Sequence, residues 1–303
     1  MILQGSMPAL VTPFRDGAVD RAALDALIAW QIDAGSSALV LAGTTGEAPT
    51  LSAAEWDTVI AAGVAGAAGA VPIVAGCGTN STAGTIDRVA RAADLGADAA
   101  MVVTPYYSKP SRGGLLAHFR AVADASPLPI MVYNIPGRSA ADIDVETLAE
   151  LAAHERIVAV KDATGDLARV ARLRLLTDPG FVQLSGEDPT AVGFNAMGGQ
   201  GCVSVTANVA PGLCAALQRA ALAGDYGTAR RLQDRLTPLH RALFLDASPG
   251  PTKYALERLG RCRAEVRLPI TPAGVAARAA VDAALAALDA DTIDGKRQEA
   301  GSA

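Results

Sequence analysis

Short apolar runs alternate with amphipathic stretches through the first 224 residues of the chain. Strands buried in a parallel sheet are nearly continuous apolar runs, whereas a helix on the sheet surface buries one apolar stripe. The pattern therefore predicts eight strands, at residues 6–11, 38–42, 72–75, 99–103, 130–133, 157–162, 181–184 and 202–205. It predicts helices at residues 20–34, 114–125, 144–153 and 211–222. For four more helices it indicates only one end: three begin at residues 52, 166 and about 189, and one ends at about residue 95.

Two of these helices have sequence signals at their first residues. Ser52 is followed three positions later by Glu55, which is typical of a capping box, and Asp144 can cap the helix that follows it. Eight strand–helix units in about 220 residues match the TIM (β/α)8 barrel, an α/β fold. A doubly wound sheet is the structural alternative, but it requires no eighth unit.

The strand pattern stops after residue 224, and further helices are predicted at residues 225–247, 252–259 and 272–288. We therefore predict a (β/α)8 barrel at residues 1–224 and a C-terminal helical appendage at residues 225–288. Residues 289–303 are mostly polar, and we expect them to form a disordered tail.

The composition argues against several functional classes. The net charge is −5, which does not favour nucleic acid or an anionic membrane as a main partner. The four cysteines form no C-x-x-C pair, which is typical of reduced thiols in a cytoplasmic protein. The three histidines lie far apart in the sequence, so we expect no metal site. The first residues lack the charged and apolar regions of a signal peptide.

Lys161, near the end of the sixth predicted strand, is the first candidate for catalysis. Side chains alternate along a strand, so Ile157, Ala159 and Lys161 are expected on one face. If that face lines the barrel, Lys161 points into its mouth, where an amine partly withdrawn from water can act as a nucleophile. Lysine can form an imine and arginine cannot, and the chain has only four lysines among its 26 basic residues. The alternative is an exposed lysine that begins a loop, with Asp162 as its surface partner.

Other polar residues follow the predicted strands at the same end, where TIM barrels carry their chemistry. They are a Gly-Thr-Thr-Gly-Glu turn at 43–47, the pair Tyr106 and Tyr107, Tyr133, and Arg138. The turn can bind a carboxylate, a phenol beside an amine can move protons, and a guanidinium matches a carboxylate. Each pattern alone has a structural alternative. The residues at 43–47 also fit an ordinary turn, the tyrosine pair an interface patch, Tyr133 a core tyrosine, and Arg138 a surface salt bridge. Together they suit imine chemistry on a 2-oxo acid, whereas the glycines near residue 200 have no P-loop lysine and do not predict phosphate binding.

Six motifs give the chain a clear resemblance to the dihydrodipicolinate synthase family of class I pyruvate-dependent aldolases, within the N-acetylneuraminate lyase superfamily. They are GTTGE (43–47), VTPYYSKPS (103–111), YNIPGR (133–138), IVAVKDATG (157–165), LSGED (184–188) and GCVSVTANV (201–209). The resemblance runs from about residue 4 to residue 285. It implies condensation of pyruvate, held as a lysine imine and enamine, with L-aspartate 4-semialdehyde. This is the 4-hydroxy-tetrahydrodipicolinate synthase step of the diaminopimelate route to lysine.

The resemblance also implies roles for individual residues. Lys161 would form the imine, and Tyr133, Thr45 and Tyr107 would relay protons, with Tyr107 reaching into the site of a neighbouring subunit. The residues implied in substrate binding are Thr44, Thr45, Arg138, Gly186 and Val203. The family implies a homotetramer built as a dimer of dimers, and neither a metal nor an external cofactor.

Two other functions remain open at this point. A sibling aldolase or lyase would share Lys161 and Tyr133 but act on a sugar-derived or other 2-oxo acid. Relatives of that kind usually lack an arginine at the position of Arg138, so Arg138 favours the synthase. A catalytically silent barrel that binds a metabolite would form no covalent adduct with pyruvate.

The resemblance generates a prediction about feedback inhibition by lysine. Inhibited members bind lysine with polar groups where this chain has Ala53 and Trp56, and with a glutamate where it has Gly84, while Asn80 and Tyr106 remain as a remnant of that allosteric site. Without the glutamate the ammonium of the inhibitor loses its main counter-charge, so we expect weak or absent inhibition. Initial rates measured with added lysine test this, and strong inhibition at low lysine concentration would contradict it.

Overall fold

Eight parallel strands form a barrel in the computed structural model, which describes residues 3–288. They are β1 (Gly5–Pro8), β4 (Leu39–Leu41), β5 (Ile73–Gly76), β6 (Ala99–Val103), β7 (Ile130–Asn134), β8 (Ile157–Asp162), β9 (Val182–Ser185) and β10 (Gly201–Ser204). From β4 to β10 each strand pairs with the next along the chain, and β1 pairs with β10. A bridge between Ala9 and Val40 joins the two ends of the sheet. This confirms the predicted barrel and rules out a doubly wound strand order.

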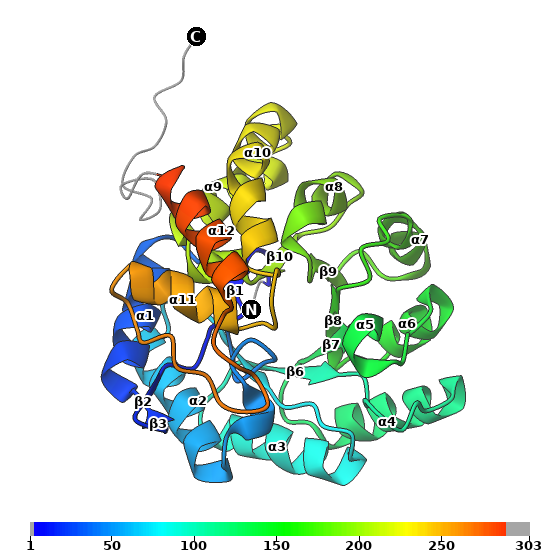
Figure 1. Cartoon of the computed structure of the whole chain (residues 1–303). Coiled ribbons are helices and arrows are strands. Elements are labelled where there is room, and N and C mark those ends of the chain that lie inside the picture. Colours follow the sequence, from blue (N-terminus) through cyan, green and yellow to red (C-terminus); the bar gives the residue numbers. More distant parts are fainter. Residues whose placement is uncertain (1–2, 289–303) are drawn as a thin grey trace.

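Helices cover the outside of the barrel between successive strands (Figure 1). They are α1 (Arg21–Asp33), α2 (Ala53–Ala67), α3 (Thr82–Asp94), α4 (Arg112–Ala125), α6 (Val145–Ala152), α7 (Ala168–Leu176), α8 (Ala191–Ala196) and α9 (Pro211–Leu222). The predicted capping box is present, because Ser52 and Glu55 each bind the backbone of the other. Asp144 caps α6 as predicted. Helix α7 begins two residues later than predicted, and Asp166 instead accepts a bond from the N–H of Ala168 at 3.0 Å.

The hydrophobic core has two layers. One fills the interior of the barrel, and the other lies between the sheet and the surrounding helices. Met7, Val40, Met131, Ala159 and other inward side chains fill the barrel, while a larger cluster packs the strands against the helices. The register of β7 and β8 shifts near their start, because Ile130 pairs with Ile157 but Met131 pairs with Ala159. Ile157 consequently lies in the outer layer.

This bulge corrects one prediction. Ile157 does not share a face with Ala159 and Lys161, because the extra residue Val158 reverses the alternation at the start of the strand. The alternation is regular from Ala159 onward, so the direction predicted for Lys161 is unaffected.

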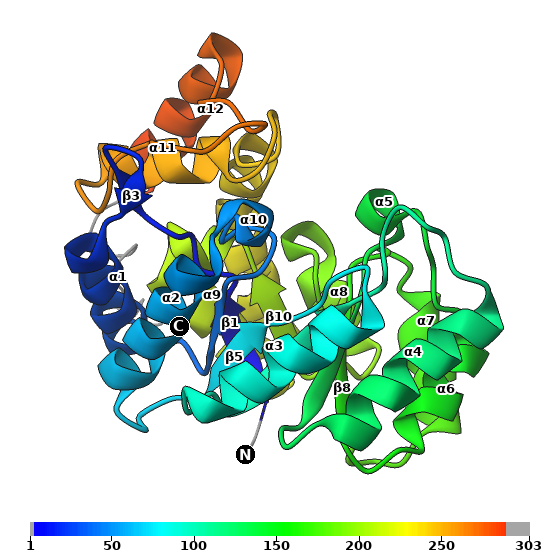
Figure 2. The same ribbon diagram turned by 90° about the horizontal axis from the view of Figure 1, so that it is seen from below.

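The C-terminal part of the described chain is helical. Helices α10 (Tyr226–Ala242), α11 (Gly250–Arg258) and α12 (Val275–Ala286) pack with α9 into a second apolar cluster, and α11 and α12 lie beyond one end of the barrel (Figure 2). Helix α10 ends at Ala242, five residues before the predicted position, with Leu243 at its C-cap. Helix α12 starts three residues late, after Gly274 in an extended conformation. The boundary at residue 224 stays a prediction, and residues 289–303, predicted to be disordered, lie outside the described residues.

Several short elements were not predicted. A hairpin of β2 (Phe14–Arg15) and β3 (Ala18–Val19) follows β1, and a single helical turn, α5 (Pro136–Ser139), follows β7. The 3-10 turns are η1 (Ala48–Thr50), η2 (Asp188–Thr190) and η3 (Thr206–Asn208). Most of them lie at the carboxyl ends of strands, where they shape the loops of the site. Within residues 3–288, no helix has the length and apolar character needed to cross a membrane.

Candidate active site

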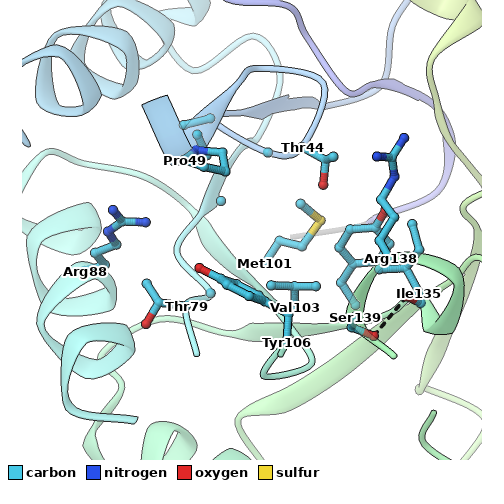
Figure 3. A pocket seen from close by; sticks show the side chains of 16 residues that line it. Thr44, Pro49, Thr79, Arg88, Met101, Val103, Tyr106, Ile135, Arg138 and Ser139 are labelled. Atoms are coloured by element: carbon cyan, nitrogen blue, oxygen red, sulfur yellow. Dashed lines mark hydrogen bonds between the residues drawn. The ribbon is translucent and has the colours of Figure 1, made fainter. Parts of the chain in front are cut away.

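A cavity of about 350 Å³ opens beside the carboxyl ends of β4 to β7 (Figure 3). Four residues predicted for the site line it: Thr44, Tyr106, Tyr133 and Arg138. The remaining lining residues are Ala42, Gly43, Ala48, Pro49, Gly76, Gly78, Thr79, Arg88, Met101, Val103, Ile135 and Ser139. The lining is mainly apolar, with an arginine from each of two separate elements. Such a cavity can hold a small organic acid.

Lys161 lies at the barrel rim, next to Tyr133. The two residues are paired in the register of β7 and β8, and Nζ of Lys161 is 4.0 Å from the centroid of the Tyr133 ring. Lys161 is only 5% exposed. Its amine therefore lies on the ring of a residue that lines the cavity, although Lys161 itself is not among the lining residues.

The alternative interpretation, an exposed lysine with Asp162 as its partner, is wrong. Asp162 is buried and binds Arg169, whose Nε donates to its carboxylate at 3.0 Å. The other carboxylate oxygen of Asp162 accepts bonds from the N–H and the hydroxyl of Thr164, at 2.9 and 2.6 Å. Arg169 also donates to the carbonyl of Ile143 at 2.6 Å. The residue after Lys161 thus fixes the strand end to α7 and leaves the amine free of that carboxylate.

Residues 43–47, which we call the threonine turn, bring Thr44 to the cavity. The N–H of Glu47 donates to the carbonyl of Thr44 at 3.1 Å, and the hydroxyl of Thr12 donates to the carbonyl of Gly46 at 2.7 Å. Thr44 is exposed and lines the cavity, whereas Thr45 is buried, at 5% exposure. Glycine is favoured at position 46, because a Cβ would lie 3.1 Å from the carbonyl oxygen of Leu10, closer than most Cβ contacts.

The two tyrosines of the loop after β6 point to different places. Tyr106 lines the cavity and is 37% exposed. Tyr107 is 88% exposed, has a positive φ of 73°, and is not among the residues that line the cavity. A left-handed backbone at a non-glycine residue is uncommon and redirects the side chain. The single chain therefore does not bring Tyr107 together with Lys161 and Tyr133.

Arg138 is carried by the single turn α5. Pro136 begins this turn, and the hydroxyl of Ser139 donates to the carbonyl of Ile135 at 2.9 Å, which holds the turn against the end of β7 (Figure 3). The guanidinium of Arg138 is exposed and lines the cavity, so it is open to a ligand.

Gly186 and Val203 surround the strand end that carries Lys161 and do not line the cavity. The N–H of Gly186 donates to the carbonyl of Asp162 at 2.6 Å. A side chain at Gly186 would come within 2.7 Å of the Cβ of Ala163. Val203 packs inside the barrel in the same cluster as Tyr133. Both positions support the geometry of the rim.

Sequence reasoning missed the end of the cavity that is formed by Thr79 and Arg88 (Figure 3). Arg88 follows Gly84 by four residues in α3, so the two share a helix face, and this spacing was the available signal. Asn80, predicted as part of a remnant lysine site, is exposed and does not line the cavity. Trp56 is buried, and its indole N–H donates to the carbonyl of Gly76 at 3.1 Å, so it is not available to a ligand.

The cysteines and histidines offer no separate chemistry in the described part of the chain. All four cysteines are free thiols, and burial raises the pKa of Cys77 to about 12. Burial also lowers the pKa of His118 and of His240, which favours their neutral forms. Among residues 3–288, no three His, Cys, Asp or Glu side chains are grouped so that they could hold a metal ion.

The chain is similar to a well-defined group of known proteins. A model of the dihydrodipicolinate synthetase family matches residues 2–288. The chain is 56% identical over 284 residues to a 4-hydroxy-tetrahydrodipicolinate synthase of Ruegeria pomeroyi, covering 94% of this chain and 98% of the relative. It is 55% identical to the protein of that name from Roseobacter denitrificans, over the same length and the same shares of both chains. A solved structure of dihydrodipicolinate synthase from Acinetobacter baumannii, complexed with pyruvate, superposes with a TM-score of 0.92 at 41% identity, covering 94% of this chain and 99% of that chain.

The buried ion pair behind Lys161 gives a prediction about stability. Arg169→Met leaves the Asp162 carboxylate buried without its cation, so we expect the free energy of unfolding to fall by about 3–5 kcal/mol. Arg172→Met is the matched control one turn away in α7, because the pair of Arg172 with Glu146 is exposed and should contribute less than about 1 kcal/mol. Urea unfolding of both variants measures the difference. Equal losses in the two variants would show that the Asp162–Arg169 pair does not hold the strand end.

Proposed function

The chain belongs to the dihydrodipicolinate synthetase family, and on that premise we propose that it condenses pyruvate with L-aspartate 4-semialdehyde through an imine on Lys161. The product is 4-hydroxy-tetrahydrodipicolinate, as the names of the curated relatives state for them. The observation that carries the proposal is the buried amine of Lys161, which lies on the Tyr133 ring beside a cavity that also contains Arg138. The enzyme is thus a lyase of the class I aldolase type.

The first chemical step forms the imine. The neutral amine of Lys161 attacks the keto carbon of pyruvate, and the resulting carbinolamine loses water to give a C=N bond. The nitrogen gives up one proton in this step, and the departing oxygen takes up two, the second from another donor, so the imine forms in its protonated state. The phenol of Tyr133 is the group of the chain that lies against the amine, so it is the proposed carrier of these protons.

The second step forms the carbon–carbon bond. The protonated imine withdraws electrons, so a methyl proton is lost and an enamine forms. Its terminal carbon attacks the aldehyde carbon of the semialdehyde, whose oxygen takes up a proton. The amino group of the semialdehyde then attacks the imine carbon, which closes the ring and releases the amine of Lys161. The lysine is regenerated, and no external cofactor is needed.

The carboxylates of the two substrates need separate partners. Thr44 and Arg138 line the cavity, so the Thr44 hydroxyl can bind pyruvate and the planar fork of Arg138 can bind the carboxylate of the semialdehyde. Thr45, which is buried beside Thr44 and is not a lining residue, is assigned to pyruvate through its backbone and side chain. The backbones of Gly186 and Val203 border the pyruvate site. Arg138 lies on α5, separate from the turn, so the two carboxylates can be bound at the same time.

A relay through Tyr133, Thr45 and Tyr107 completes the proposal. Tyr107 would serve the cavity of a second copy, in a homotetramer built as a dimer of dimers. Its 88% exposure and positive φ support this, because a phenol turned away from its own cavity is available to another chain. We also propose a cytoplasmic location, and low sensitivity to lysine because Gly84 provides no carboxylate and the Trp56 N–H is already bound.

The other two functions considered from the sequence have less support. A sibling lyase for a sugar-derived oxo acid would share Lys161 and Tyr133, but the curated relatives above are named as synthases, and Arg138 lines the cavity. A silent barrel would have no use for a buried amine beside a phenol at the cavity. No separate observation on the structure favours either function.

Trapping of the imine tests the central step. Incubation of the wild-type enzyme with pyruvate and borohydride should add the mass of one reduced pyruvate per chain, located at Lys161 by peptide mapping. Lys161→Arg keeps the positive charge but cannot form an imine, so we expect no adduct and loss of essentially all turnover. Lys109→Arg changes an exposed lysine of the loop after β6 and serves as the matched control, with adduct and turnover retained. An adduct on another residue, or turnover by Lys161→Arg, would refute the proposal.

Arg138→Ala separates the two substrates. Loss of a charge-assisted bond to the semialdehyde should lower kcat/KM for this substrate by roughly 10- to 100-fold, because such bonds contribute about 1.5–3 kcal/mol. Imine trapping with pyruvate alone should be unchanged, since Arg138 takes no part in that step. Steady-state kinetics and intact mass measure the two effects. An equal loss of imine formation would mean that Arg138 acts on pyruvate instead.

A further inference from the structure

A buried ion pair joins the threonine turn to the C-terminal helices. Nζ of Lys253, in α11, lies 2.5 Å from Oε1 of Glu47, the last residue of the turn, and their side chains are 0% and 2% exposed. The other carboxylate oxygen of Glu47 accepts a bond from the backbone N–H of Arg267 at 2.9 Å, across 220 positions of sequence. Both oxygens of Glu47 are therefore held by the C-terminal part of the chain.

The ammonium of Lys253 is enclosed on other sides as well. It donates to the carbonyl of Glu265 at 2.7 Å and lies 4.0 Å from the centroid of the Phe14 ring. Burial lowers the pKa of Lys253, and the carboxylate of Glu47 opposes that change. Each charge is buried next to the other, so removing one leaves the other without its partner in a nonpolar environment.

Arg267, whose backbone N–H binds Glu47, also attaches the C-terminal segment around it to other parts of the chain. Its guanidinium binds Glu55, the partner of Ser52 in the capping box of α2, and donates to the carbonyls of Thr50 at 2.8 Å and Gly17 at 2.6 Å. The bond from Arg267 holds the pKa of Glu55 down at about 2. The segment that contacts Glu47 is thus attached to the first turn of α2 and to the β2–β3 hairpin, and it cannot follow Glu47 if the turn moves.

Glu47 itself has a backbone that needs such support. Its φ is 55°, in the left-handed region, where a non-glycine residue is strained unless its surroundings hold it. Its N–H donates to the carbonyl of Thr44, so its position determines that of the residue that lines the cavity. Neither Glu47 nor Lys253 lines the cavity itself.

We propose that Lys253 and Glu47 are positioning residues for pyruvate, and that through this pair the C-terminal helices hold Thr44 and Thr45 in place for its carboxylate. The inference rests on the proposed function of the threonine turn. It assigns the helical appendage a part in the first half of the reaction, in addition to its own packing. Without the pair, the carboxylate of Glu47 is buried without its cation and is drawn toward water, and the turn loses its position.

Lys253→Met tests the proposal, because methionine fills much of the space of lysine without its charge. The two substrates react in separate steps, so kcat/KM for pyruvate and for the semialdehyde report on different halves of the reaction. We expect kcat/KM for pyruvate to fall by roughly 10- to 100-fold, as a displaced binding group does, and that for the semialdehyde to stay within about threefold. The rate of borohydride trapping with pyruvate should fall in parallel.

The double variant Glu47→Gln with Lys253→Met provides the rescue. It removes both charges and keeps an oxygen for the N–H of Arg267, and replacing both partners of a buried pair can be nearly neutral. We expect kcat/KM for pyruvate to return to within about threefold of the wild-type value. If Lys253→Met does not fold, Glu47→Asp retains the charge but withdraws it from Lys253, and it should show the same loss for pyruvate alone.

Val281→Ala is the control for general loss of stability. Val281 is fully buried in α12 and packs in the C-terminal cluster, with no part in the ion pair. This variant should lower Tm and leave kcat/KM for pyruvate unchanged. Unchanged pyruvate kinetics in Lys253→Met and Glu47→Asp, or an equal loss in Val281→Ala, would overturn the positioning role. Failure to trap an imine in the wild-type enzyme would refute the proposed function instead, so the two outcomes are distinct.

Discussion

The register between β7 and β8 is the constraint on which the site depends. It pairs Tyr133 with Lys161, so that a phenol ring and an amine meet at the rim of the barrel. Side chains of a strand alternate between two faces, and a slip of one residue would turn Lys161 from the interior toward the helices. The bulge at the start of β8 adds one residue and thereby brings Ala159 and Lys161 onto the inner face. The position of the amine is therefore set by backbone pairing at some distance from the chemistry.

The groups around Lys161 come from loops that are each fixed by bonds of their own. The threonine turn is closed by backbone bonds and held by Glu47, α5 is held by Ser139, and the rim at Gly186 is bound to the strand end of Lys161. Loops are usually the mobile parts of a barrel, and reactions that need close alignment lose rate when a binding group is displaced. These local attachments convert three loops into a nearly rigid site.

The sequence predicted the barrel, its order of elements and the proximity of Lys161 and Tyr133, because these follow from apolar runs and from the parallel arrangement of strands. It did not predict that Ile157 faces outward, since a bulge has no signature in an apolar run such as 157–160. Nor did it predict Arg88 in the cavity, because the spacing from Gly84 places the two residues on one helix face but does not show that this face meets a cavity. The Glu47–Lys253 pair joins residues far apart in sequence, and no local pattern can indicate such a contact. The orientation of Tyr107 depends on one left-handed residue, which propensity alone does not indicate.

Two buried lysines in this chain each lie on an aromatic ring but differ in their charged neighbours, and the difference fits the roles that we propose for them. Lys253 contacts a carboxylate and a carbonyl oxygen, which stabilise an ammonium and occupy its donors. Lys161, within the described residues, has its amine on the face of an aromatic ring and forms no ion pair. An ammonium that is already paired cannot attack a carbonyl carbon, because its nitrogen has no free electron pair. Placing Asp162 against Arg169 and Thr164 keeps the nearest carboxylate in the sequence away from Lys161. The same residue type is thus a structural cation at Lys253 and, in the function that we propose, a nucleophile at Lys161, according to where the neighbouring carboxylates are directed.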